Sequence, residues 1–492
     1  MEPQQGTVLI GVVLVAVDLA IRIAALIVIP RDRKPTAAMA WLLAILLVPY
    51  LGILFFLLIG STRLPRKRRA KQAEVNRMIS AGVRDVHVVP SGGMAQWPEW
   101  FGGVVDLNRA LGALPAVRGS RAELVGDYAA SFAGMTADVD SATSFVHVEF
   151  YIVSYDATTK DFFRAMEEAV ARGVVVRLLL DHIASIRSPG HKETLAELDR
   201  IGVQWSFMLP VRPWRGQWQR PDLRNHRKLV VVDGRVGWMG SQNLIDRSYN
   251  LPKNLKRGLQ WQDLMTRTTG PVVSGINVVF LSDWYCETDQ VLDAEHVAAS
   301  DVMVDDSPAA LECQVVPSGP GFEYENNLHL FLALLYSARD RVIITSPYFV
   351  PDEAMMYAIT SACRRGLDVQ LFVSEWGDQG PVFHAQRSYY GALLRAGVRI
   401  FMYPPPFILH AKHLSIDDST AVIGSSNMDI RSFALDLEVS LLVRGNGFVD
   451  QMRVVEDGYR QASRELTLAE WEKEPLRATA LDGLARLTSA LQ

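Results

Sequence analysis

Two segments of the chain repeat the same residue types at the same spacing. Each has a histidine, a lysine two residues later, an aspartate seven residues later, and a Gly-Ser-x-Asn sequence that begins fourteen residues after the histidine. A lone histidine is usually structural, but two copies in register predict one functional site built from both segments. The repeated residues are His226, Lys228, Asp233, Ser241 and Asn243 in the first segment, and His410, Lys412, Asp417, Ser425 and Asn427 in the second.

These residue types suit phosphoryl transfer. One imidazole can attack phosphorus while the other protonates the leaving oxygen. Two lysines, with serine and asparagine donors, can hold the oxygens on which negative charge builds. Because the lysines supply this positive charge, the sequence predicts chemistry that needs neither a metal ion nor another cofactor. The remaining histidines lack the spacing of a zinc site and are interpreted as structural or surface residues; examples are His87, His182, His191 and His296.

The spacing also predicts how the motif residues are positioned. On a β-strand, residues two apart lie on the same face, so each histidine and its lysine converge on one ligand. Apolar residues continue each strand to a turn, and a second strand returns to bring Gly-Ser-x-Asn beside the histidine. Asp233 and Asp417 complete the catalytic motif, and we expect them to support this turn more than to contact a substrate.

The chain around these motifs is a tandem repeat. The extended run from His147 to Val153 matches the run from Ile344 to Val350, and each is followed by an amphipathic helix, a glycine and a β-rich strand. Strands that alternate with helices predict an α/β sandwich in each half. The expected fold is α/β, with duplicated α/β/α sandwich domains over residues 116–305 and 306–492.

The two halves differ most just before the motif. From Gly202 to His226 there are 24 residues, but from Gly397 to His410 there are only 13. The insertion falls between Leu209 and Arg224 and interleaves arginine with tryptophan, which suits an anionic lipid surface or nucleic acid. A solvated loop with two packed tryptophans is the plainer alternative. The residues of this candidate interfacial loop are Arg212, Trp214, Arg215, Trp218 and Arg220.

Two apolar runs precede the repeat, at Thr7–Ile29 and Ala37–Ile59. Each has 23 residues, about 35 Å of helix, which is enough to cross a ~30 Å hydrocarbon layer. Residues 1–65 are therefore expected to form a transmembrane hairpin with spans at about 7–29 and 37–59. Asp18 and Arg22 lie four apart in the first run and could pair on one helix face.

Basic residues in the flanks predict the orientation of this hairpin. Three lie between the runs and six follow the second run, so both termini are expected in the cytoplasm. Residues 66–115 are interpreted as a basic juxtamembrane linker, whose cluster from Arg66 to Arg69 either rests on anionic headgroups or serves only as a stop-transfer flank. The basic residues are Arg31, Arg33 and Lys34 in the loop, and Arg63, Arg66, Lys67, Arg68, Arg69 and Lys71 after it.

Composition narrows the function further. The 492 residues carry a net charge of −4, which does not suggest a nucleic-acid binder. The three cysteines, Cys286, Cys313 and Cys363, form no C-x-x-C pair and suit a reducing compartment. With an apolar N-terminal region on the same chain, a phospholipid bilayer is the expected partner.

At the paired motifs the sequence resembles the phospholipase D superfamily, whose hallmark is a paired H-x-K-x4-D. Within it, the resemblance is to bacterial cardiolipin synthases and covers nearly the whole chain. One departure is His413, directly after Lys412, where a small hydroxyl residue is common; a strand neighbour should point to the opposite face. The segments that carry the closer resemblance are Ala40-Trp-Leu-Leu, Val48–Gly52, Val146–Ile152, Asp222–Lys228, Gly270–Val273, Asp283-Trp284 and Ser346–Pro351.

The resemblance implies a metal-free, ping-pong phosphatidyl transfer at one site shared between the halves. Phosphatidylglycerol would be the donor and a second phosphatidylglycerol the acceptor, giving cardiolipin and glycerol. His226 looks like the nucleophile, and His410 looks like the acid and then the base. Asp263 and Glu438 look like the carboxylates that orient the imidazole of their own half. The expected location is the bacterial cytoplasmic membrane, with the catalytic domains in the cytoplasm.

Alternative functions share these catalytic residues. A membrane-bound phospholipase D would hydrolyse or transphosphatidylate other phospholipids with the same motifs. A nuclease is compatible with superfamily chemistry, but the apolar N-terminal runs and the acidic net charge argue against nucleic acid. A non-catalytic membrane scaffold would not need two intact motifs. The sequence leaves the oligomeric state, the acyl preference, the acceptor alcohol and, by its symmetry, the choice of nucleophile open.

Overall fold

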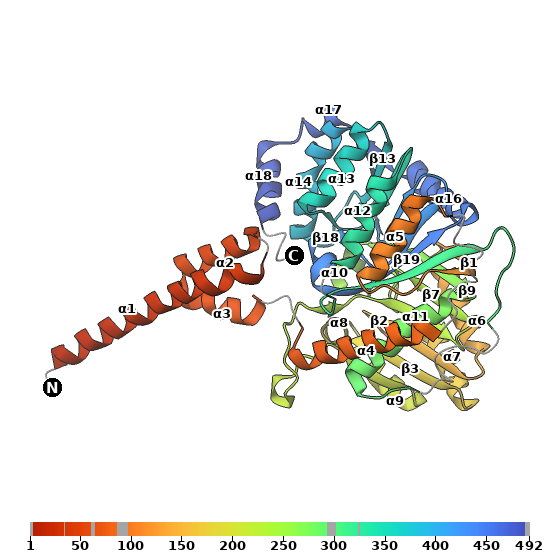
Figure 1. The fold of residues 1–492 in the computed structure, drawn as a ribbon, viewed down its shortest axis with the longest axis horizontal. Helices are drawn as coiled ribbons and strands as arrows, with labels where there is room; N and C mark the ends of the chain where they lie inside the picture. Colours follow the sequence, from red (N-terminus) through yellow and green to blue (C-terminus); the bar gives the residue numbers. More distant parts are fainter. Residues whose placement is uncertain are drawn as a thin grey trace. The chain divides into compact units, whose positions relative to one another are not determined.

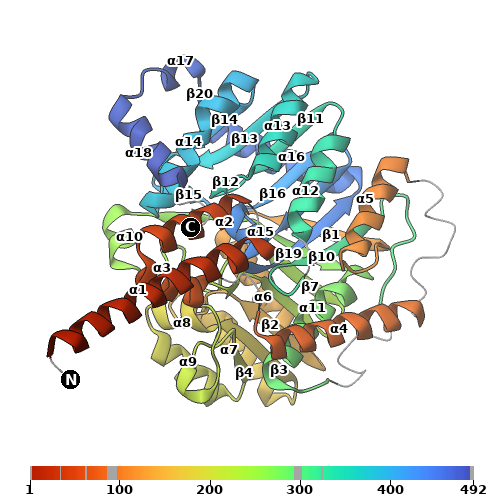
Figure 2. The same ribbon diagram turned by 60° about the vertical axis from the view of Figure 1, so that its left-hand side comes forward.

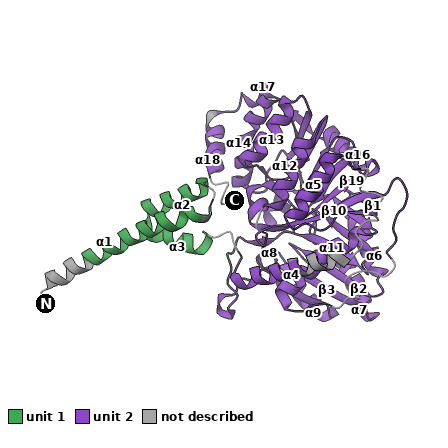
Figure 3. Cartoon of the chain, viewed as in Figure 1, with its two compact units in different colours: residues 1–63, 220–222 green, residues 64–219, 223–492 purple. Residues whose placement is uncertain are grey.

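The computed structural model describes residues 3–33, 35–60, 64–85, 97–292, 302–322 and 325–487. The chain divides into two compact units (Figure 3). The smaller unit comprises residues 1–63 with 220–222 and contains the apolar N-terminal helices. The larger unit comprises residues 64–219 and 223–492 and contains both copies of the repeated motif.

The smaller unit begins with the long helix α1 (Pro3–Val28), which continues into a short 3₁₀ turn. Within the described residues, Gly11–Arg31 is the one helical stretch both long and apolar enough to cross a membrane. Arg22 Nε lies 2.7 Å from Asp18 Oδ2, so the expected pair one turn apart is present. The pairing neutralises both charges within an otherwise apolar helix.

The second apolar run differs from the prediction of one continuous span. It forms two helices, α2 (Pro35–Leu47) and α3 (Pro49–Ile59), which meet at Val48. Pro49 disfavours the helical conformation for the residue before it, and Val48 has φ −135° and ψ 76°. At 1.5 Å per residue, α2 and α3 are ~20 Å and ~16 Å long, so neither crosses a ~30 Å core alone.

The helices α2 and α3 fold back on each other. The rings of Trp41 and Phe56 make an edge-to-face contact at 5.5 Å. A Cβ on Gly52 would lie 2.8 Å from the backbone of Ala44 and Ile45, so glycine permits this close approach. At the open end of the pair, Arg33 Nη2 donates to Gly60 O at 2.7 Å. The predicted second transmembrane helix is therefore wrong in form: the run is a helical hairpin whose ends lie together.

The larger unit is built on one continuous mixed sheet (Figure 1). Its order is β20-β14-β13-β11-β16-β17-β19-β10-β1-β9-β7-β6-β2-β3-β4. The first-half strands are β1 (Val117–Val125), β2 (Phe145–Phe150), β3 (Val175–Asp181), β4 (Gln204–Met208), β6 (Lys228–Val232), β7 (Val236–Gly240) and β9 (Met265–Thr269). The second-half strands are β10 (Leu311–Ser318), β11 (Arg341–Thr345), β13 (Asp368–Ser374), β14 (Arg399–Tyr403), β16 (His413–Ile416), β17 (Thr420–Gly424), β19 (Asp436–Arg444) and β20 (Arg464–Leu466).

The strand order confirms the duplication. Reading outward from the centre, β1-β9-β7-β6-β2-β3-β4 in one half corresponds to β10-β19-β17-β16-β11-β13-β14 in the other. The halves join through β1 and β10, which pair antiparallel with Val117 opposite Cys313. Because these central strands belong to different halves, the two sandwiches share one sheet and cannot move apart without breaking its ladder.

Helices cover both faces of this sheet, as expected for an α/β/α sandwich (Figure 2). One outer layer packs Phe163 and Met166 against first-half strands, and a separate second-half core contains Leu334 and Ile359. The opposite layer is a single core that spans both halves and includes Phe280. The helices of the two layers are α6 (Tyr128–Asp140), α7 (Lys160–Ala171), α9 (His191–Ile201), α11 (Val272–Thr288), α12 (Asn326–Ser337), α13 (Glu353–Arg364), α14 (Gly380–Ala396) and α16 (Asn446–Ala462).

Residues 66–115 differ from the predicted linker in their described part. They form α4 (Arg66–Asp85) and α5 (Glu99–Ala110), and both helices pack on the larger unit. Arg68 is buried in an ion pair with Glu287 of α11, so it is not available to lipid headgroups. Phe101 of α5 joins the second-half core. The segment thus extends the fold, because its apolar and charged residues both find partners there.

Shorter elements complete the larger unit. The helical ones are α8 (His182–Arg187), η3 (Pro213–Arg215), α10 (Pro252–Arg257), α15 (Ile430–Ala434), α17 (Leu468–Trp471) and α18 (Leu476–Leu487). The short strands are β5 (Arg224–Asn225), β8 (Gln260–Gln262), β12 (Phe349–Val350), β15 (Phe407–Leu409) and β18 (Met428–Asp429). Three of these strands, β5, β8 and β15, lie directly before the residues that form the candidate site.

Candidate active site

Backbone pairing between the halves places the two histidines. β5, just before His226, pairs in parallel with the start of β19 of the second half. β15, just before His410, pairs in parallel with β8 of the first half. The pairing continues into the motifs: His226 N donates to Leu437 O at 2.8 Å, and His410 N donates to Gln262 O at 2.7 Å. Each histidine is therefore held by the half to which it does not belong.

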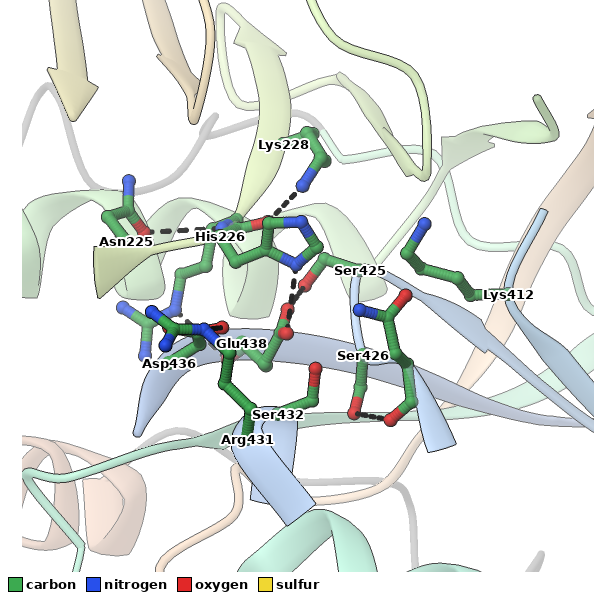
Figure 4. A network of polar contacts seen from close by, with 12 residues as sticks. Asn225, His226, Lys228, Lys412, Ser425, Ser426, Arg431, Ser432, Asp436 and Glu438 are labelled. Carbon is green, nitrogen blue, oxygen red and sulfur yellow. Dashed lines mark hydrogen bonds and ion pairs between the residues drawn. The ribbon is translucent and has the colours of Figure 1, made fainter. Parts of the chain in front are cut away.

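This crossing decides which carboxylate meets which imidazole. Glu438 Oε1 lies 2.9 Å from His226 Nδ1 (Figure 4), and Asp263 Oδ1 lies 2.6 Å from His410 Nδ1. The expectation that each carboxylate orients the histidine of its own half is therefore wrong. Asp263 and Glu438 are the correct residues, but the partners are exchanged, because β8 and β19 each deliver their acid across the junction between the halves.

The serines of the two Gly-Ser-x-Asn sequences hold these carboxylates. Ser241 Oγ donates to Asp263 Oδ1 at 2.7 Å, and Ser425 Oγ donates to Glu438 Oε2. All four side chains are buried. A carboxylate fixed in this way accepts Nδ1–H of the imidazole and leaves Nε2 as the free ring nitrogen. Ser241 and Ser425 thus hold in place the carboxylates that orient the two imidazoles.

The lysines lie beside the histidines as the strand period predicts. Lys228 Nζ donates to His226 O at 2.5 Å, and Lys412 Nζ donates to His410 O at 2.8 Å. Both side chains are buried, and burial lowers the pKa of both amines, that of Lys412 to about 8. Figure 4 shows Lys228 and Lys412 near the ring of His226. Two buried cations concentrated in this way provide a site for an anion.

Burial and the lysine charges also act on the imidazoles. Burial, with the nearby charge of Lys412, lowers the pKa of His410 to about 3. Burial and the charges of Lys228 and Lys412 hold the pKa of His226 well below its ordinary value. Both environments therefore favour the neutral form of the imidazole. A neutral ring that donates Nδ1–H to a carboxylate has a lone pair at Nε2, as a nucleophile or base requires.

The two carboxylates differ in their own acidity. Burial raises the pKa of Glu438 to about 7, despite the opposing charge of Lys228. For Asp263, burial also acts to raise the pKa, but the charges and hydrogen bonds of His410 and its other polar neighbours outweigh burial and lower it. Asp263 is therefore ionised over the physiological range, while Glu438 titrates near neutrality.

The asparagines of the motif are placed differently in the two halves. Asn243 Nδ2 donates to Tyr249 OH at 2.8 Å, and the ring of Tyr249 lies 6.5 Å from that of His410. Asn427 is buried, and its Oδ1 accepts no hydrogen bond from any part of the chain that the structure describes. Asn427 thus retains an acceptor that a bound substrate could use.

Asp233 and Asp417 lie at the far ends of the motif strands, as supports of the turn. Five residues of strand, ~16 Å, separate each from its lysine. Asp233 accepts from the backbone N–H groups of Ser144 and Phe145, and Asp417 accepts from those of Asp340 and Arg341. The expectation that these two aspartates are catalytic residues is therefore corrected: they tie the turn to the neighbouring strand and do not reach the histidines.

His413, the departure from the family pattern, points away from the site. Its Nε2 lies 3.3 Å from Glu456 Oε1 of α16 and 3.1 Å from Thr345 Oγ1. Its neighbour Lys412 faces the histidines on the other side of the strand. The alternation of a strand therefore separates His413 from the chemistry, as expected.

Two pairs of residues that sequence reasoning missed line the site. Arg247 and Arg431 each follow their motif histidine by 21 residues, a constant offset that could have identified them. Arg431 Nε lies 3.1 Å from Asp436 Oδ2, and Arg247 Nε donates to Trp261 O at 2.9 Å. Tyr151 lies 5.1 Å from the ring of His226, and the hydroxyl of its counterpart Tyr348 donates to Asp378.

Three separate motif segments converge behind His226. Arg227 Nε donates to the backbone carbonyl of Glu438 at 3.0 Å, and its guanidinium forms a buried ion pair with Asp283 of α11. Glu149 of β2 is fully buried beside them, and burial together with the charge of Asp283 raises its pKa well above the ordinary value. This buried cluster braces the strand that presents Glu438 to His226.

The inserted loop exposes part of its predicted surface. Trp214 is 79% exposed and Trp218 46%, and Arg215 is exposed between them. Arg212 instead donates to His182 Nε2 at 3.2 Å, and Arg220 pairs with Asp222 at 2.6 Å. Two of the three loop arginines thus already have partners, so the tip from Trp214 to Trp218 is the part free to meet a surface.

Comparison with known proteins identifies the repeated fold. A family described as "Cardiolipin synthase, PLD-like domain" matches residues 135–266 and 331–455. A second family, described as "Phospholipase_D-nuclease N-terminal", matches residues 20–61.

Among the described residues, no group of three His, Cys, Asp or Glu side chains is placed to hold a metal ion.

Curated relatives match along nearly their whole length. Cardiolipin synthase of Geobacillus kaustophilus is 30% identical over 98% of this chain and 94% of its own. Cardiolipin synthase A of Serratia proteamaculans is 31% identical over 91% of each. The crystal structure of phosphatidylserine synthase from Haemophilus influenzae shares the fold, with a TM-score of 0.60 and 13% identity over 79% of this chain and 100% of that one. The chain belongs to the bacterial cardiolipin synthase family of the phospholipase D superfamily.

Proposed function

We propose that this protein joins two molecules of phosphatidylglycerol into cardiolipin and releases glycerol, through a covalent phosphatidyl-histidine. The observation that carries the proposal is the crossed pair of histidine–carboxylate contacts, His226–Glu438 and His410–Asp263, beside two buried lysines. The names of the curated relatives supply the product, and the geometry supplies the two steps.

In the first step, His226 Nε2 attacks the phosphorus of the donor phosphatidylglycerol. A P–N bond forms and the P–O bond to the headgroup glycerol breaks, while Nε2–H of His410 gives its proton to the departing oxygen. The negative phosphodiester offsets the charges of Lys228 and Lys412, so substrate binding raises the pKa of His410 and permits it to hold that proton. Glu438 stabilises the positive charge that develops on His226.

In the second step, a hydroxyl of the acceptor phosphatidylglycerol gives its proton to His410 Nε2 and attacks phosphorus. A new P–O bond forms, the P–N bond breaks, and both imidazoles return to their initial state. In both steps the ammonium groups of Lys228 and Lys412 hold the oxygens on which charge accumulates. The chain's own residues thus supply nucleophile, acid, base and charge stabilisation.

The assignment of His226 as nucleophile is supported by accessibility. The side chain of His226 is 12% exposed and that of His410 is 5% exposed, so His226 is the more open of the two to an incoming phosphodiester. Trapping with labelled phosphatidylglycerol, followed by peptide mapping, should place the label on His226. Label on His410 would reverse the roles of the two histidines.

A product assay tests the reaction itself. Purified full-length protein incubated with phosphatidylglycerol alone is expected to form cardiolipin and glycerol in equal amounts. Phosphatidic acid with glycerol would instead mean that water takes the place of the acceptor hydroxyl. That outcome would convert the proposal into the alternative, a membrane-bound phospholipase D.

The family and the apolar N-terminal helix indicate a membrane protein, and the larger unit is proposed to lie on the cytoplasmic side. The helical hairpin α2–α3 starts and ends on the side where α1 ends, because Arg33 bonds the carbonyl of Gly60. The described basic residues Arg31 and Arg33 lie at this end of the smaller unit, which positive-inside bias assigns to the cytoplasm. The N-terminus, which has no basic side chain before α1, is accordingly proposed outside, a revision of the orientation expected from sequence. To test this, a reporter that works only in the cytoplasm is fused to Met1. Activity of that fusion would contradict the proposed orientation.

A further inference from the structure

We propose that a hollow between α10 and the loop that follows β13 holds the acceptor phospholipid by its own phosphate. This inference rests on the proposed function and specifies where its second substrate binds. The hollow has a volume of about 630 Å³ and is lined by residues of both halves. They are Lys256, Arg257, Glu375, Trp376, Gly377 and Phe383.

The charges at this hollow favour an anion. In the described part of the chain, the guanidinium of Arg257 bonds a backbone carbonyl and no carboxylate, and Lys256 forms no ion pair. The acidic side chain in the lining, Glu375, is already paired with Arg464 at 3.0 Å. Arg257 is fixed in place, with its guanidinium 5.5 Å from the ring of Trp376 and two hydrogen bonds to Gly377 O. The hollow therefore presents two available cations on a defined surface.

The remaining walls of the hollow suit a lipid more than a free phosphate. Trp376 is 41% exposed, and Phe383 lines the hollow beside it. Leu255, on the adjacent helix α10, is 58% exposed. Tryptophan with exposed aliphatic residues and basic side chains is the composition found at the level of phospholipid headgroups. An anionic glycerophospholipid matches both the charged and the apolar part.

The hollow adjoins the elements that hold His410. α10 ends at Arg257, and β8 begins at Gln260 and leads to Asp263, which binds His410. On the other side of the hollow, the loop from Trp376 to Gln379 follows β13, whose last residue Ser374 accepts from Leu409 N. A smaller pocket shares Trp376, Gly377 and Phe383 with the hollow and reaches Tyr348 and Ile408, two residues before His410.

The chemistry explains why the acceptor belongs on this side. In each step the attacking and leaving atoms lie on opposite faces of phosphorus, and one of them is always His226 Nε2, so the position opposite His226 holds the glycerol oxygen first and the acceptor hydroxyl second. His410 serves both oxygens, because it is the acid in one step and the base in the other. In an acceptor phosphatidylglycerol, the glycerol that bears the reacting hydroxyl also carries a phosphate, which links it to diacylglycerol. Free glycerol has no such phosphate. That phosphate needs a cationic site near His410, and Lys256 and Arg257 line the hollow that adjoins the elements holding His410.

The test separates the two half-reactions. Exchange of labelled glycerol into phosphatidylglycerol uses only the first step and its reverse, whereas cardiolipin formation also needs the acceptor lipid. In the Lys256→Ala/Arg257→Ala variant we expect cardiolipin formation at subsaturating lipid to fall about tenfold, since each basic side chain contributes to binding an anionic lipid. Glycerol exchange should stay within about twofold of the wild type, which also shows that the variant folds.

A matched control comes from a second basic hollow. Arg364 and Arg395 line a hollow of about 570 Å³ between α13 and α14 that shares no residue with the site or with the proposed hollow. Arg364→Ala/Arg395→Ala removes the same charge and should change neither reaction. Trp376→Ala, tested in parallel, should lower cardiolipin formation without lowering exchange.

Three results would overturn the proposal. If the Lys256→Ala/Arg257→Ala variant loses exchange and cardiolipin formation equally, the hollow serves the donor or the fold. If both activities are unchanged, the hollow does not bind a substrate lipid. If the wild type exchanges glycerol but makes phosphatidic acid in place of cardiolipin, the proposed function fails and the acceptor site fails with it.

Discussion

The two halves of the larger unit share a frame but differ in the side chains that complete it. In the first half, Asp181 at the end of β3 accepts from Asn225 N and pairs with Arg224. At the same place in the second half, Ser374 accepts from Leu409 N. A charged pair and a hydroxyl thus perform the same structural task. Duplication preserves the backbone connection to each histidine and leaves the surrounding charge free to diverge.

The same comparison distinguishes the two histidines. His226 faces Glu438, whose pKa is raised to about 7, and Tyr151 lies beside its ring. His410 faces Asp263, whose pKa is lowered, and the elements that hold His410 adjoin the basic hollow. A permanently ionised partner suits a group that exchanges a proton in both steps. The symmetric motifs are therefore expected to perform unequal tasks, and substitutions in one half should not reproduce those in the other.

The largest difference should come from the histidines themselves. His226→Ala removes the nucleophile, so no covalent phosphatidyl intermediate can form and turnover should fall by roughly 10⁴-fold or more. His410→Ala should still form the intermediate slowly from a substrate with a nitrophenyl leaving group, which needs little protonation. Single-turnover release of nitrophenol measures this. Equal release by both variants would mean that the roles are not divided as proposed.

The two lysines are expected to contribute equally to turnover, since both hold phosphoryl oxygens. Lys228→Ala and Lys412→Ala each remove a cation fixed beside the phosphoryl oxygens, and each is expected to lower turnover by about 10²–10³-fold. Thermal unfolding should shift little, because a buried cation is costly to retain. Turnover at saturating lipid is the measurement. A large loss in one variant only would show that the oxygens are held from one half.

Replacing each orienting carboxylate with its amide tests the crossed histidine–carboxylate contacts. Asp263→Asn should impair both proton transfers at His410, and we expect a loss of about 10² in turnover. Glu438→Gln should slow formation of the intermediate on His226 and leave the second half-reaction less affected. Rapid-quench measurement of the labelled intermediate separates the steps. Slower proton transfer at His410 in Glu438→Gln would contradict the crossed contacts and mean that each carboxylate acts on the histidine of its own half.

The acid limb of the pH dependence should report Glu438. Below about pH 7 its carboxyl is protonated and no longer balances the charge that develops on His226, so kcat/KM should rise with pH through about 7. In Glu438→Gln this acid limb should be absent, with a low and flat rate. Asp263→Asn should keep the limb, since the pKa of Asp263 is already low. A limb that persists in Glu438→Gln would assign the titration to another group.

The inserted loop, which only the first half has, should show the smallest effect. Trp214→Ala/Arg215→Ala is expected to raise the apparent KM for bilayer phosphatidylglycerol a few-fold and leave turnover at saturating lipid unchanged, because uniform binding is lost. Arg212→Ala is the matched control, since that side chain already contacts His182 and Phe207. An equal effect on a soluble short-chain substrate would place the loop in the catalytic pocket.

Much of the site could be read from the sequence because strand geometry is local. A spacing of two puts His226 and Lys228 on one face, a turn follows at Asp233, and the returning strand brings Ser241. These relations need only the period of a strand, and the second copy repeats them. The duplication and the α/β/α layers follow from the same pattern, whereas the orienting carboxylates Asp263 and Glu438 were expected from the family resemblance.

Other features had a local signal whose consequence depended on packing. Pro49 marks a helix boundary in the sequence, but the fold-back of α2 and α3 also required Gly52 to admit the backbone of Ala44. The offset of 21 residues shared by Arg247 and Arg431 is visible in the sequence, yet it does not reveal that one bonds a carbonyl and the other an aspartate. Local sequence thus predicts which residues or boundaries matter, and the residues packed against them decide what they do.

The sequence by itself determined the chemistry: two histidines, two lysines and two carboxylates, on strands of a duplicated fold. Only the tertiary structure decided how they are shared. The short strands before His226 and His410 pair with chain more than a hundred residues away, and backbone hydrogen bonds across that junction exchange the carboxylates between the halves. No local period encodes such a pairing, because it depends on which sheet edges meet when the two halves join through β1 and β10.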